Sequence, residues 1–132
     1  MSTPEHEQLK ELIETGEPVD WAVVETVWRG AEGFYEGPVG FWGERSIEEQ
    51  ALERVVEAGW IPDAMLFDGL ADPSAYLAAY AFTALTRRQS PLVRAIPSVL
   101  KHRDEEVVSI CGCMVVAQSL ADFARHRHNT EG

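Results

Sequence analysis

Two cysteines and two histidines in the last quarter of the chain are the residue types that could hold a zinc ion: Cys111, Cys113, His126 and His128. Ligand pairs of structural zinc sites usually lie two to four residues apart on a turn. Cys111 and Cys113 lie in a predicted helix, where side chains two positions apart diverge by about 200°. We therefore predict no metal, no disulfide and no cofactor. Buried, reduced cysteines, which suit the cytoplasm, are the better interpretation, with Gly112 marking close helix approach.

Glycines recur at every third position from 37 to 43, which raises the question of a phosphate-binding loop. The spacing matches neither the P-loop nor the dinucleotide fingerprint, and no strand is predicted before the segment. Three neighbouring carboxylates would also repel an anion: Glu32, Glu36 and Glu44. We predict no phosphate site here.

Catalytic signatures are missing from the sequence, which has no nucleophile elbow, no HExxH pair and no kinase motif. Only generic carboxylate pairs remain, and these are better explained as turn, cap and surface residues: Glu48/Glu49, Asp68/Asp72 and Glu105/Glu106. We predict that the protein is not an enzyme. A least-favoured alternative is a small-ligand pocket lined by Trp60, Tyr76, Tyr80 and His102.

The segment from Gly30 to Arg45 combines glycines with four aromatic residues, a composition in which no regular element is expected. Long connections tend to be functional, and aromatic side chains with a charged rim are typical anchors of protein interfaces. The predicted partner-binding residues are Glu32, Phe34, Tyr35, Glu36, Phe41, Trp42 and Glu44. Equally, the four aromatic side chains could fold back and close one end of the core.

The net charge of −11 is distributed unevenly. Residues 1–63 hold 15 Asp/Glu and 4 Lys/Arg, whereas residues 64–132 hold 7 of each. A field of this sign repels nucleic acid and anionic lipid and attracts basic surfaces. We predict a basic protein partner, no nucleic acid and no membrane. The competing interpretation is that acidic helix faces only keep the protein soluble.

Capping residues divide the chain into about seven helices, and no run alternates as a half-buried strand would, so we predict an all-α fold. Ser46 and Glu49 form a capping box that opens a helix ending near Ala58. The last helix is predicted to begin after Asp104 and to be apolar nearly all round over 107–117. That run is too short to span a bilayer, and no leader is recognised, so a cytoplasmic protein is expected.

Two segments about 31 residues apart look like copies of one unit, each with a short helix, a turn and a second helix lined with small residues: 64–74 and 96–107. Over about residues 47–124 the chain resembles the HEAT-like repeats of α-solenoids. It departs at Ala78 and Ser109, where these repeats usually carry arginine. The resemblance implies antiparallel helix pairs in a short right-handed stack and a role as a binding scaffold. A compact helical bundle is the alternative.

The chain is expected to form one domain, 1–132, with four parts: an acidic helix pair (1–29), the glycine and aromatic loop (30–45), HEAT-like helices (46–126) and a tail (127–132). The predicted function is a non-catalytic protein-interaction module that binds a basic protein surface. Its concrete form is an immunity or antitoxin-like inhibitor of a toxic enzyme. The alternative is a regulatory or assembly scaffold that self-associates.

Overall fold

The structure is a computed structural model that describes residues 3–37, 45–112 and 114–131, without the side chains of 128–131. Its elements in chain order are α1 (Pro4–Thr15), α2 (Trp21–Arg29), β1 (Phe34–Glu36), α3 (Ile47–Glu57), α4 (Asp63–Gly69), α5 (Ala75–Arg87), the 3₁₀ helix η1 (Pro91–Ala95), α6 (Ile96–Leu100), β2 (Glu106–Cys111), β3 (Met114–Ser119) and α7 (Leu120–Glu131).

Helix starts follow the capping residues of the sequence. The hydroxyl of Thr3 accepts a hydrogen bond from the backbone N–H of His6, and that of Ser46 accepts one from Glu49, both at 3.1 Å. Asp20 caps α2 in the same way. These side chains satisfy amides that a helix start leaves without a partner. The predicted start of α3 after Ser46 is confirmed.

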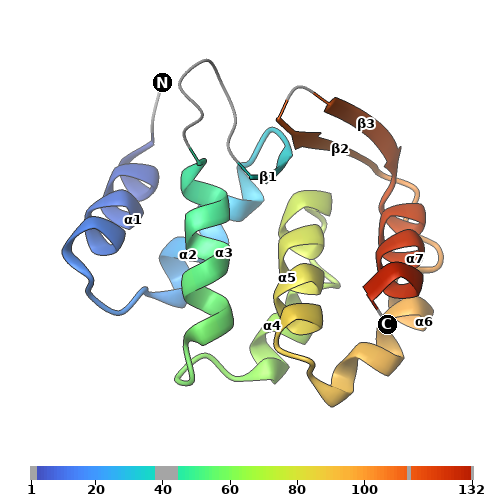
Figure 1. Cartoon of the computed structure of the whole chain (residues 1–132). Coiled ribbons are helices and arrows are strands. Elements are labelled where there is room, and N and C mark those ends of the chain that lie inside the picture. Colours follow the sequence, from blue (N-terminus) through green and yellow to red (C-terminus); the bar gives the residue numbers. More distant parts are fainter. Residues whose placement is uncertain (1–2, 38–44, 113, 132) are drawn as a thin grey trace.

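Helices α1, α3, α5 and α7 lie side by side, and the sheet lies across one end of α5 and α7 (Figure 1). Helix α5 is the centre of this row because almost its whole length is buried: Ala75, Leu77, Ala78, Ala79, Tyr80, Ala81, Phe82, Thr83, Ala84 and Leu85. Small side chains on α5 allow neighbouring helices to approach closely. The core therefore forms around α5 and receives side chains from both halves of the chain.

The predicted all-α fold is wrong. The segment expected to form the last apolar helix, 107–117, instead forms the antiparallel hairpin of β2 and β3, in which Ser109 pairs with Val116. The burial of β2 alternates, with Val107 and Ser109 buried and their neighbours partly exposed. Gly112 has a φ of +61°, a left-handed conformation that suits a tight turn and not a helix. Its predicted role in helix approach is therefore wrong as well.

The third strand comes from the segment predicted to lack regular structure. β1 pairs in parallel with β2, placing Phe34 opposite Ser109, and the sheet order is β1-β2-β3. Its hydrogen-bonding partner is distant in sequence, so local composition could not indicate this strand. Of the two segments that carry the HEAT-like resemblance, the first continues into α5, whereas the second continues into β2 and β3.

The segment that begins at Pro91 contains a second proline, Pro97. The chain here forms η1 and then α6, with Pro97 in the first turn of α6, where its missing N–H costs nothing. Within the described residues, no helix is both long enough and apolar enough to cross a membrane.

Candidate interaction surface

In the described part of the predicted loop site, the alternation of side chains along β1 places the predicted contact residues on two opposite faces. Successive side chains of a strand point to opposite faces, so Phe34 and Glu36 lie on one side of β1 and Tyr35 on the other. Phe34 is fully buried, with its ring centroid 4.6 Å from that of Tyr80 and 4.9 Å from that of Phe123. Phe34 therefore belongs to the core and offers no contact to a partner.

Glu36 is engaged inside the protein by Arg127. One guanidinium N–H donates to Glu36 Oε2 at 3.0 Å, and a second forms a close ion pair with Oε1. The guanidinium carbon also lies 4.4 Å from the ring centroid of Phe123 and 5.0 Å from that of Phe34. Arg127, expected in a solvated tail, belongs to α7 and joins that helix to β1.

Glu32 and Tyr35 line a hollow between the start of α1, the end of α2 and β1. Its volume is about 450 Å³, and His6 and Glu48 also line it. His6 Nε2 lies 3.7 Å from Glu48 Oε1. Burial raises the pKa of the Tyr35 phenol, and the nearby charges of Glu48 and Glu32 raise this pKa further. The hollow is thus acidic, and its electrostatic field favours a cation.

The remaining predicted contact residues, Phe41, Trp42 and Glu44, lie outside the described residues, as does Cys113. Cys111 is a free, exposed thiol at the end of β2. His126 Nδ1 lies 3.1 Å from Gln118 Oε1. Among the residues that the structure describes, no group of three or more His, Cys, Asp or Glu side chains could hold a metal ion.

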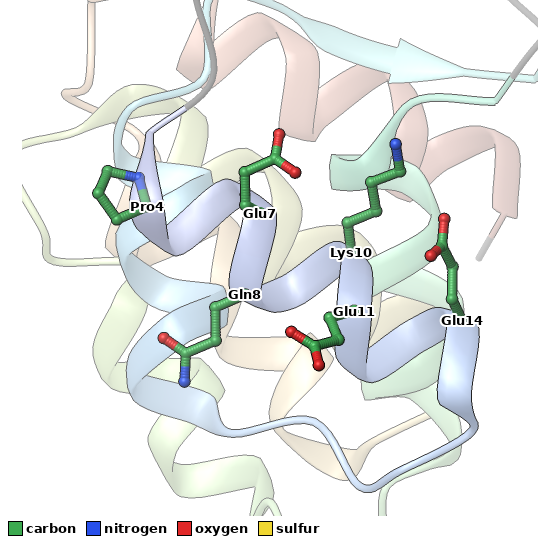
Figure 2. Close-up of a pocket in the computed structure, with 6 residues that line it drawn as sticks. All are labelled: Pro4, Glu7, Gln8, Lys10, Glu11 and Glu14. Carbon is green, nitrogen blue, oxygen red and sulfur yellow. The ribbon is translucent and has the colours of Figure 1, made fainter.

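The outward face of α1 carries an acidic hollow of about 430 Å³ lined by Pro4, Glu7, Gln8, Lys10, Glu11 and Glu14. Figure 2 shows these side chains projecting from α1, with Lys10 between Glu7 and Glu14. The helix turns its buried side, Leu9 and Ile13, toward the protein. Its outer side therefore presents three carboxylates and one ammonium group to solvent.

A third hollow, of about 260 Å³, lies where α1 and α3 end and contains an exposed tryptophan. It is lined by Gly16, Glu17, Pro18, Val19, Arg54, Glu57 and Trp60. Trp60 is 59% exposed, and its indole N–H donates to the carbonyl of Val19 at 3.2 Å. This hydrogen bond fixes the ring while leaving much of it open to solvent between the carboxylates of Glu17 and Glu57. We call α1 and this hollow together the acidic surface.

The arginines of the first half form no ion pair with a carboxylate of the acidic surface in the described structure, although Arg54 itself lines the hollow beside Trp60. Arg29 pairs with Asp72 at 2.7 Å, Arg45 pairs with Glu49 and Glu53, and Arg54 donates to the carbonyl of Ile13 at 3.0 Å. Within the described part of the chain, six carboxylates of the acidic surface take part in no ion pair: Glu5, Glu7, Glu11, Glu14, Glu17 and Glu57.

Such an arrangement of carboxylates around an exposed indole can bind cationic groups. Carboxylates attract lysine and arginine, and the face of an indole is the best aromatic partner for a cation. Sequence reasoning missed Trp60 as a contact residue. The available signal was its position between the helix-ending Gly59 and the helix-starting Pro62, outside any buried helical face.

Comparisons of the chain with protein-family models, with curated proteins and with solved structures gave no match.

Proposed function

We propose that this protein is a non-catalytic interaction module that binds a basic protein through its acidic N-terminal half. The observation that carries the proposal is the acidic surface, in which Trp60 stands exposed beside carboxylates that have no internal partner. Exposed tryptophan is a frequent source of binding energy at protein interfaces. The surrounding negative charge speeds the encounter with a basic surface.

At Trp60, the proposed contact is with a lysine or arginine side chain of the partner that inserts into the hollow. Its cation would lie against the indole face, and Glu17 and Glu57 would supply opposite charge from the rim. Glu32 and Tyr35, in the hollow beside His6, extend the contact toward the predicted loop. Phe34 and Glu36 take no part, since the core and Arg127 already engage them.

An immunity or antitoxin-like inhibitor is the concrete form of this proposal. Enzymes that act on nucleic acid carry basic active-site surfaces, and an acidic protein of this size can cover such a surface. A toxic enzyme encoded beside this protein is the partner to test first. Its activity should be suppressed at low salt and restored as salt screens the charges.

The test is retention of a basic protein from the source-cell lysate at low and at high salt. Three forms are compared with the wild type: Glu7→Gln/Glu11→Gln/Glu14→Gln, Trp60→Ala, and the control Asp68→Asn/Asp104→Asn/Glu106→Gln. The control removes three carboxylates that are also free of ion pairs in the described structure but belong to the second half of the chain.

We expect the wild type and the control to retain the same basic protein at low salt and to release it at high salt. The Glu7→Gln/Glu11→Gln/Glu14→Gln variant and Trp60→Ala should each retain several-fold less of this protein. Circular dichroism establishes that each variant is folded. Equal retention by all four proteins would refute the assignment of the acidic surface.

A further inference from the structure

Among the described residues, strand β3 is an unpaired edge of the sheet and carries the most exposed apolar side chains of the C-terminal half. The strand order β1-β2-β3 leaves one side of β3 without a neighbouring strand from the described part of the chain. Met114 is 66% exposed, Val115 65% and Val116 46%. Every second residue of such an edge also directs its backbone N–H and C=O away from the sheet. The edge thus combines unpaired backbone groups with exposed apolar side chains.

Natural edge strands are usually protected by charges, proline, bulges or short length. β3 has none of these among its described features. It is paired with β2 residue by residue from Met114 to Ser119 without a bulge, and it contains no proline. No charged residue occurs between Val107 and Ala121. An edge of this kind favours the addition of another strand.

The charge distribution indicates what kind of strand would add to the β3 edge. A basic or acidic partner would find no opposite charge on β3, whereas a second copy brings the same uncharged, apolar strand. β3 and the acidic helix α1 lie at opposite ends of the molecule (Figure 1). Contact through β3 therefore keeps the acidic halves of two copies apart, although each whole chain carries a net charge of −11.

We propose that β3 pairs antiparallel with β3 of a second copy, joining two three-stranded sheets about a two-fold axis. Residues directly opposite one another in an antiparallel ladder point to the same face of the sheet. The two-fold axis must therefore pass between one residue of β3 and the same residue of the second copy. A register centred on Val115 or Val116 places the exposed apolar residues of the two copies against one another. In either register one valine lies opposite its own copy, and the two β-branched side chains contact one another across the ladder.

One strand gives a smaller interface than the roughly 800 Å² per partner that is typical of stable complexes. The dimer is therefore weak, and its population depends on protein concentration. This inference is independent of the proposed binding of a basic partner, because the two surfaces share no residue. Together they would give one dimer with two acidic surfaces facing in opposite directions.

Sedimentation velocity over about two orders of magnitude of concentration tests the dimer. The wild type is compared with Val115→Lys, which places a charge on the edge, and with Val99→Lys, a matched control on α6 whose valine is 38% exposed. Wild type and Val99→Lys should shift from monomer toward dimer with concentration, whereas Val115→Lys should stay monomeric. A wild type that is monomeric throughout, or dimers of Val115→Lys, would overturn the proposal.

Hydrogen exchange of the wild type locates the interface without any substitution. Amides of β3 should exchange several-fold more slowly at high than at low protein concentration, and amides of α1 should not change. Concentration-dependent protection that appears elsewhere and not in β3 would also overturn the proposal.

Discussion

The hydroxyl of Tyr80 is the polar group that ties the central helix to the sheet. It donates to the carbonyl of Gly33 at 3.2 Å and accepts from the N–H of Tyr35 at 3.0 Å. The ring is fully buried and stacks on Trp28 with centroids 5.2 Å apart. A single side chain on α5 thus satisfies the backbone on both sides of Phe34.

Replacing Tyr80 by phenylalanine should keep the stacked ring and remove both hydrogen bonds. Two backbone groups would then lack partners, and leaving such a group unsatisfied costs about 1–3 kcal/mol. We expect the free energy of unfolding to fall by that amount in urea denaturation. Tyr76→Phe is the comparison, because it loses a single bond, from the N–H of Val108, and should cost less. Equal stability of Tyr80→Phe and wild type would contradict this account.

Burial raises the pKa of Tyr80 well above its usual range. The unfolded chain releases the phenolic proton near pH 10, whereas the folded protein retains it. The folded state then binds more protons, so stability is complete below pH 10 and falls as the pH rises above it. Between about pH 9 and about pH 11, the wild type should lose about 1.4 kcal/mol more than Tyr80→Phe. An identical loss in both proteins would assign alkaline unfolding to other groups.

At the scale of elements, Arg88 joins the end of α5 to the end of α3. Its guanidinium donates to the carbonyls of Ala58 and Ile61 at 2.9 and 2.7 Å, and to Asp63 at 2.8 Å. Carbonyls at a helix end have no partners within the helix. Hydrogen bonds from Ser90 and then from Arg88 lower the pKa of Asp63.

Arg88→Ala should therefore lower the free energy of unfolding by about 2–4 kcal/mol. Arg87→Ala is the matched control, since Arg87 is the neighbouring residue of α5, is exposed and forms no ion pair in the described structure. Its loss should stay within about 0.5 kcal/mol. Thermal or urea unfolding of the two variants measures the difference, and similar losses would show that Arg88 does not act as a helix clamp.

Helix starts could be predicted because a cap is local: Ser46 and Glu49 lie within one turn of each other. The hairpin could not, because a continuous apolar run such as 107–117 is compatible with a buried helix as well as with a strand. Its β-branched residues and Gly112 were the signals that favoured strands. β1 depends on pairing between Phe34 and Ser109, which no local pattern encodes.

For the candidate site, the sequence allowed us to predict the negative charge but not the residues that form the surface. Counting residues located the acidic half, and the structure identifies which of its carboxylates are free of ion pairs in the described chain. For Trp60 the sequence offered only its place between Gly59 and Pro62, because the hydrogen bond from its indole to Val19 joins it to another segment and has no local signal. Phe34 was placed in the predicted site because aromatic composition does not distinguish a buried ring from an exposed one.

At the scale of the whole molecule, the uncompensated acidic half should oppose folding. Glu14 lies in the last turn of α1, where no basic residue is present and the helix dipole disfavours negative charge, and Glu11 lies just before that turn. Glu11→Gln/Glu14→Gln should therefore raise the free energy of unfolding by about 0.5–1 kcal/mol at low salt.

Salt provides the check on this prediction. Raising NaCl from about 0.05 to about 0.5 M screens exposed charges, so the wild type should gain stability and the gap to the variant should shrink. Glu7→Gln is the control, because Glu7 lies in the first turn, where the dipole favours its charge, and its replacement should bring no gain. A gap that is unchanged by salt would point to helix propensity as the cause.

The parallel pairing of β1 with β2 has a consequence for synthesis of the chain. Proteins emerge from the ribosome amino end first, and contacts between distant segments form late. Helices α1, α2 and α3 can pack on one another early, but Phe34 waits for Ser109 and Phe123 before its place in the core exists. The nascent protein therefore carries an incompletely buried Phe34 until β2 and α7 have been synthesised, and this part of the core closes only then.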